Sequence, residues 1–154
     1  MEPIEVAAWV THSVFAGLWT GSVLFLTFAV LPLARDGTMK AGPLASITGK
    51  LTTVSRVSAL LLLITGGHMA AQRYTSETLV ETQAGWLVLS MVALWFLLMA
   101  VVEVGSKKVT AGTDQGKLRE PARNARPFFL AASVLALLLL VNAGLISANT
   151  LGFL

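Results

Sequence analysis

The sequence predicts an all-α integral membrane protein, a four-helix bundle forming a single transmembrane domain over residues 1–154. Hydrophobic residues make up 55% of the chain. Only 12% of the residues are charged, against about 25% in soluble proteins. The charges are also clustered, which leaves charge-free stretches of 29, 16, 21 and 28 residues at 6–34, 57–72, 82–102 and 127–154. A membrane helix needs about 20 apolar residues, and the second stretch reaches that length if Arg56 lies near the headgroups.

The first stretch predicts a helix near residues 6–33. It begins with Glu2 and Glu5 instead of a basic segment, and it is far longer than the roughly 7 to 15 apolar residues of a signal-peptide core. We therefore expect a retained helix. The other helices are expected near 52–73, 83–106 and 126–148, with Pro127 in the first turn of the last one.

The basic residues predict the orientation of these helices. Arg73 alone falls on one predicted side of the membrane. The other ten lie on the opposite side, in or beside the loops after the first and third helices: Arg35, Lys40, Lys50, Arg56, Lys107, Lys108, Lys117, Arg119, Arg123 and Arg126. The positive-inside rule then predicts a multi-pass protein of the cell membrane with the N-terminus and the C-terminus both outside. We expect these loops to contact the anionic lipids of the bilayer and not nucleic acid.

The only two histidines of the chain, His12 and His68, are predicted at one depth. Each lies about five or six residues inside the outer end of its helix, so both are roughly 8 to 9 Å below the outer boundary. Asn142 of the last helix falls into the same layer. Polar and ionisable side chains within a bilayer are costly and indicate a functional site.

Two neutral imidazoles in an apolar bundle can ligate a haem iron. We expect b-type haem with His12 and His68 as metal ligands, in a protein of electron transfer or haem handling. Trp19, on the helix stripe of His12, and Asn142 would line the cofactor. Arg73 lies just above the layer and could receive the haem propionates, or could be an interfacial anchor.

Two other functions stay open. His and Met ligands suit Cu(I), and Met91 lies near the required depth, which would make the chain a copper transport or delivery protein. Alternatively, the histidines form hydrogen bonds between helices of a cofactor-free structural subunit. The lack of cysteine excludes thiolate metal sites, iron–sulfur clusters and thiol catalysis. No motif decides whether the chain is an enzyme.

Gly17 and Gly21 form a GxxxG pair on the face of the first helix that points away from His12. Such a pair lets two helix backbones approach closely. It predicts a contact with another helix of the bundle or with a second copy of the chain, so a homodimer or a larger membrane complex is one of the expected states.

The first helix also carries a resemblance to a known group. Its residues 12–32 read HSVFAGLWTGSVLFLTFAVLP, in which Trp19 follows His12 by seven residues. This stretch resembles the CopD-like (copper-resistance D type) membrane proteins and the related HemJ-type protoporphyrinogen oxidases. For the HemJ type, the resemblance implies a histidine of the first helix and a lysine of the third that are associated with haem. His12 matches the histidine, the third helix has no lysine, and His68 is the replacement ligand that this chain offers.

Overall fold

The computed structural model describes residues 2–150, and these residues form an all-α structure. Within this range there is no β-strand. The elements in chain order are α1 (Pro3–Phe25), the π-helical segment η1 (Leu26–Val30), α2 (Leu31–Asp36), α3 (Ala41–Ala71), α4 (Ser76–Glu81), α5 (Gln83–Thr113) and α6 (Arg119–Thr150). The predicted fold class is confirmed.

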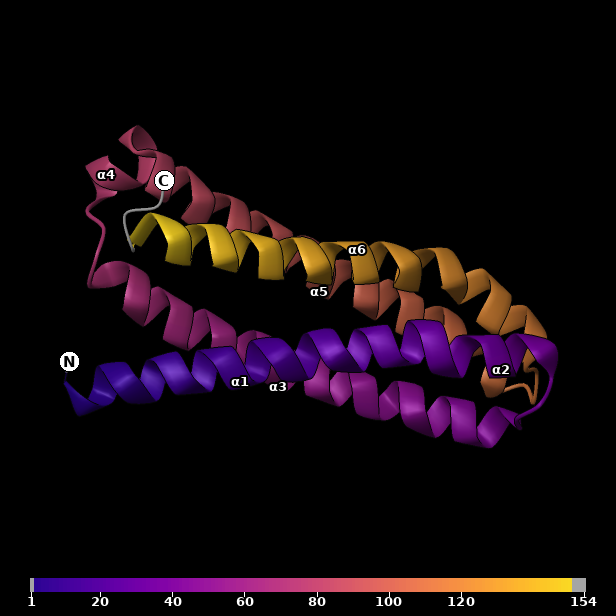
Figure 1. Cartoon of the computed structure of the whole chain (residues 1–154). Helices are drawn as coiled ribbons and strands as arrows, with labels where there is room; N and C mark the ends of the chain where they lie inside the picture. Colours follow the sequence, from indigo (N-terminus) through magenta and orange to yellow (C-terminus); the bar gives the residue numbers. More distant parts are fainter. Residues whose placement is uncertain (1, 151–154) are drawn as a thin grey trace.

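Four long rods make up the bundle, because α1, η1 and α2 follow one another without a break (Figure 1). Each rod is long and apolar enough to cross a membrane. The first rod packs against α3, α3 packs against α5, α5 packs against α6, and α6 closes the ring against α1 and α2. The start of α1 and the end of α6 lie at the same end of the bundle (Figure 1). We call this end the outer end and the opposite one the inner end, after the predicted topology.

The helices extend further at the inner end than the charge-free stretches predict. α3 begins at Ala41 instead of near residue 52, and α6 begins at Arg119 instead of near residue 126. Charged side chains are costly only within the bilayer, so the turns that extend beyond it can carry them. A charge-free stretch therefore marks only the part of a helix that lies within the bilayer. The prediction that Pro127 lies in a first turn is wrong, since this proline is inside α6, whereas Pro121 is in the first turn. Membrane helices tolerate an internal proline when neighbouring groups take up the freed carbonyl.

Burial is uneven along the bundle. The inner part holds a continuous apolar core that includes Trp19, Leu26, Leu44, Val102 and Phe129. Toward the outer end, buried side chains become rare among the described residues. Residues 3–18 of α1 contribute only Ala8, residues 83–97 of α5 only Gly85, and residues 137–150 of α6 only Asn142. The four rods are therefore tightly packed at the inner end and loosely packed at the outer end.

Two hydroxyl groups join the first rod to α6 within the inner part. Ser133 donates a hydrogen bond to the hydroxyl oxygen of Thr27 at 3.0 Å, and Thr27 itself lies in η1. The Thr27 hydroxyl is also 3.1 Å from the carbonyl oxygen of Phe129. A π-helical segment fits one additional residue into a turn and often adjusts which side chains face inward. Here it coincides with this polar contact between the rods.

Candidate functional site in the outer half of the bundle

His12 lies on the face of α1 that packs against α3. Its Nδ1 atom is 2.9 Å from the hydroxyl oxygen of Thr65, a buried residue of α3. The Thr65 hydroxyl in turn donates to the carbonyl oxygen of Leu61, one helical turn earlier, at 2.6 Å. Together these two contacts favour one tautomer of His12.

A threonine hydroxyl has one proton to donate. With that proton assigned to the 2.6 Å contact with Leu61, the Thr65 oxygen accepts from His12, and Nδ1 of His12 is the N–H donor. In a neutral imidazole the other nitrogen, Nε2, then keeps its lone pair. Metal-binding histidines in proteins are commonly held in this way, with the nitrogen remote from the metal donating to an oxygen of the protein.

Gly66 brings the backbone of α3 against the imidazole. A Cβ atom on this glycine would lie 3.0 Å from Cε1 of His12 and 3.6 Å from Nδ1. The two helices are thus in direct contact at the level of Thr65 and Gly66. Directly packed helices are about 8 to 10 Å apart, which is too close for a porphyrin ring between them.

His68 lies one turn closer to the outer end than Thr65. The side chain is half-buried, and its Nε2 atom is buried without a hydrogen-bond partner among the described residues. The prediction that both histidines share one depth is therefore inexact, because His12 is level with Thr65 and Gly66. The offset arises because α1 begins at Pro3, earlier than expected, and α3 ends at Ala71, earlier than expected.

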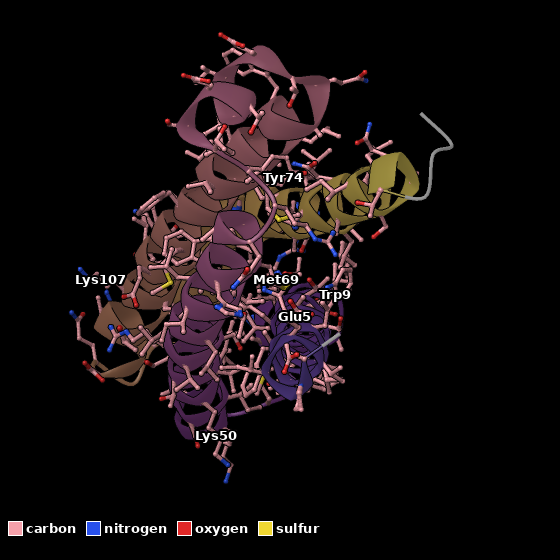
Figure 2. The ribbon with its side chains drawn as sticks, turned by 90° about the vertical axis from the view of Figure 1, so that its left-hand side faces the viewer. Glu5, Trp9, Lys50, Met69, Tyr74 and Lys107 are labelled. Atoms are coloured by element: carbon pink, nitrogen blue, oxygen red, sulfur yellow. The ribbon has the colours of Figure 1, made fainter. Side chains whose placement is uncertain are left out.

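Arg73 covers the outer rim of this region. Its guanidinium carbon lies 5.7 Å from the centre of the Trp9 ring, a cation–π contact between the segment after α3 and the start of α1. Figure 2 views the bundle from this end and shows Trp9 on α1, Met69 on α3 and Tyr74 just after α3. The contact holds a positive charge three residues above His12 on α1 and five residues beyond His68 on α3.

Asn142 joins α6 to α5 instead of reaching the histidines. It is only 6% exposed, and its amide nitrogen donates to the carbonyl oxygen of Leu87 at 3.1 Å and to the hydroxyl of Ser90 at 2.8 Å. The Oδ1 atom is buried and has no partner among the described residues. Asn142 thus presents one free acceptor in the outer half of the bundle.

Trp19 is part of the inner core and is 2% exposed. It lies seven residues after His12 on the same face of α1. Trp19 is therefore about two turns closer to the inner end than the histidine and not level with it. Its Nε1 atom is buried without a hydrogen-bond partner in the described chain, as is Nε1 of Trp95 on α5. Thr65 was not predicted as a site residue, and only the packing of α1 against α3 identifies it.

The described residues contain no cluster of three or more His, Cys, Asp or Glu side chains that could hold a metal ion. A protein-bound metal would therefore rely on the two histidines, together with thioether or cofactor ligands. Met69 and Met91 are both half-buried, on α3 and α5 respectively. Comparison of the chain with models of known protein families, with curated proteins and with solved structures yields no match.

Proposed function

We propose that this chain is a multi-pass cell-membrane protein with both termini outside that binds b-type haem in the outer half of its bundle. The observation that carries the proposal is the hydrogen bond from His12 to Thr65, because it leaves Nε2 of His12 free to ligate a metal. Haem iron exchanges single electrons, which suits a role in electron transfer or haem handling.

Several features around His12 suit such a group. His68 offers a second Nε2 for a metal, and this atom is buried without a partner in the described chain. The loosely packed outer half leaves few side chains that a cofactor would have to displace. Arg73 holds a positive charge at the outer rim, where carboxylates of a cofactor would emerge. The contact of Gly66 with His12 leaves no room for a macrocycle between α1 and α3 at this level, so a haem held by both histidines would require the outer turns of these two helices to separate.

Copper is the second candidate. A single Cu(I) ion needs little room, so the direct contact between α1 and α3 does not oppose it. Imidazole and thioether groups are its preferred ligands, and the two histidines with Met69 or Met91 would supply them. The chain would then transport or deliver copper.

An absorption spectrum and a metal assay of the gently purified protein test these proposals, with His12→Ala and His68→Ala as the main variants. If both histidines are axial ligands, each alanine variant loses haem or changes it from low spin to high spin. Asn142→Leu is the matched control, because Asn142 is buried at the same end but bonds to α5.

The remaining outcomes discriminate among the functions. A Soret band that survives in His68→Ala but not in His12→Ala leaves His12 as a single ligand. Bound copper without a Soret band, lost in both variants, favours copper delivery. A helical, monodisperse protein that takes up neither haem nor copper would overturn both proposals and favour the structural-subunit alternative.

A further inference from the structure

A hollow of about 330 Å³ lies at the inner end of the bundle, between α2 and the start of α6. It is lined by Arg35 and Asp36 of α2 and by Arg119, Glu120 and Arg123 of α6. The two helices pack against each other here, so three guanidinium groups from distant parts of the sequence surround one space. It is far from the histidines and plays no part in the haem proposal.

The positive charge of these arginines is only partly offset by the acids beside them, and none of the three forms an ion pair in the described chain. Within residues 2–150, none of the three guanidinium groups has a carboxylate oxygen within 4.0 Å. Glu120 pairs instead with Lys117, at 3.4 Å. Three arginines against two acids leave the lining with a net charge of +1, and Lys117 beside it raises the local sum to +2.

One of the arginines is held in position by the turn after α2. Arg119 donates from Nη2 to the carbonyl oxygen of Asp36 at 3.3 Å. Its guanidinium lies against Gly37, which has a φ of 80°, and a Cβ atom there would approach Nη2 to 2.6 Å. The positive φ favours glycine at this position, whereas the end of the flexible Arg119 side chain can shift away from an added Cβ. The turn therefore orients a planar donor group at the edge of the hollow.

The surface next to the hollow is apolar. Phe28 of η1 and Leu33 of α2 are 61% and 51% exposed, and they precede Arg35 by seven and two residues on the same rod. Apolar side chains below a cluster of arginines match the two parts of a phospholipid, the acyl chains and the phosphate group. In the predicted topology this surface is at the level of the inner headgroups.

We propose that the hollow formed by Arg35, Arg119 and Arg123 binds the phosphate group of an anionic phospholipid of the inner leaflet. Guanidinium groups bind phosphate oxygens through paired N–H donors, which distinguishes a specific site from the general attraction of basic loops to anionic lipid. A free phosphate ion offers the same chemistry, and the experiment separates the two sources.

The test measures lipid binding to the purified full-length protein by native mass spectrometry, with phosphatidylglycerol and phosphatidylcholine as probes. Arg35→Gln/Arg123→Gln removes two arginines of the hollow that make no hydrogen bond within the described chain. Lys50→Gln/Arg126→Gln is the control, because it removes the same charge from exposed inner residues outside the hollow. We expect phosphatidylglycerol binding to weaken about tenfold or more in the first variant and to change little in the control.

Equal losses in the two variants would show non-specific attraction and overturn the proposal. If inorganic phosphate displaces phosphatidylglycerol, and the protein binds phosphatidylglycerol and phosphatidylcholine equally well, the hollow binds a free anion. That result would overturn the proposal that the phosphate belongs to a lipid. Arg119→Lys keeps the charge but removes the planar fork, so we expect it to weaken phosphatidylglycerol binding several-fold while circular dichroism shows the same helix content. Unchanged binding in this variant would contradict the paired-donor geometry.

Discussion

The ring of His12 rests on the backbone of α3 at Gly66, where a methyl group would come within 3.0 Å of Cε1. This contact and the hydrogen bond to Thr65 together position the imidazole. A Cβ atom at the neighbouring Gly67 would have nothing within 4 Å. The two adjacent glycines therefore form a matched pair of sites for testing how the ring is held.

Gly66→Ala and Gly67→Ala should differ in their effects on the bundle. Replacement of a helical glycine by alanine raises the free energy of unfolding by roughly 0.5–1 kcal/mol, so we expect Gly67→Ala to raise the thermal stability. In Gly66→Ala the contact with His12 offsets this gain, and any cofactor spectrum shifts. Thermal melts and absorption spectra of the two variants provide the comparison, and identical results would mean that the ring does not rest on Gly66.

Thr65→Val should remove the acceptor for Nδ1 of His12 while keeping the shape of the side chain. We expect a loss of about 1 kcal/mol of stability and a weaker or altered cofactor spectrum, because the tautomer of His12 is no longer held. Thr65→Ser should restore both. Thr53→Val is the control, since this exposed threonine of α3 bonds only to the carbonyl of Gly49 in its own helix. An effect of equal size at Thr53 would point to helix propensity alone.

Gly17→Ile and Gly21→Ile should not lower the stability of the bundle. Both glycines are exposed, with no atom within 4 Å of an added Cβ, so neither packs against another helix of the described bundle. Gly105→Ile is the contrasting variant, because its Cβ would meet Phe128 and Phe129 at 3.1–3.2 Å and should cost about 1–3 kcal/mol. Thermal melts test the stability, and size measurement in detergent shows whether the glycine face holds a second copy.

The ion pair between α3 and α5 should stabilise the contact between these helices only when both of its side chains are present. Arg56 donates from Nε and Nη2 to the Glu103 carboxylate at 2.6 and 3.0 Å. We expect a small but measurable coupling energy in a double-mutant cycle with Arg56→Gln and Glu103→Gln. The same cycle on Lys117 and Glu120, which are 3.4 Å apart and more evenly exposed, should give a value near zero. Similar coupling energies for the two ion pairs would show that the two hydrogen bonds from Arg56 to Glu103 add nothing to the stability.

The predicted orientation can be tested by labelling, because the chain has no cysteine. Ser76→Cys and Gln115→Cys replace exposed residues at opposite ends of the bundle, in α4 and in the turn after α5. An impermeant thiol reagent should label position 76 from outside intact cells and position 115 only after lysis. Labelling of both positions in intact cells would contradict the four-helix topology. Labelling of position 115 alone in intact cells would show that the orientation is the reverse of the predicted one.

The fold could be predicted because charges are costly in lipid. The charge-free stretches therefore indicated four rods and their order, and the structure confirms an all-helical chain with four helices able to span a membrane. The inner helix ends could not be predicted in this way. Residues 41–51 of α3 lie beyond the charge-free stretch, where charges are tolerated and composition no longer distinguishes helix from loop.

The candidate site could be predicted only in part. His12 and His68 were identified because they are the only histidines in an apolar chain. The bond between His12 and Thr65 spans 53 residues and depends on the register between α1 and α3, which no local pattern encodes. For the same reason, the depth of Asn142 could be predicted but its hydrogen-bond partners on α5 could not.

The uneven burial along the bundle has a consequence for its motions. Local opening costs least where few apolar contacts must be broken, so backbone amides near the outer ends of α1 and α5 should exchange with solvent or lipid-phase water earlier than those around Phe129. The outer turns can then separate while the inner core keeps the four rods joined. A bulky ligand could thus enter and leave sideways from the lipid without global unfolding of the protein.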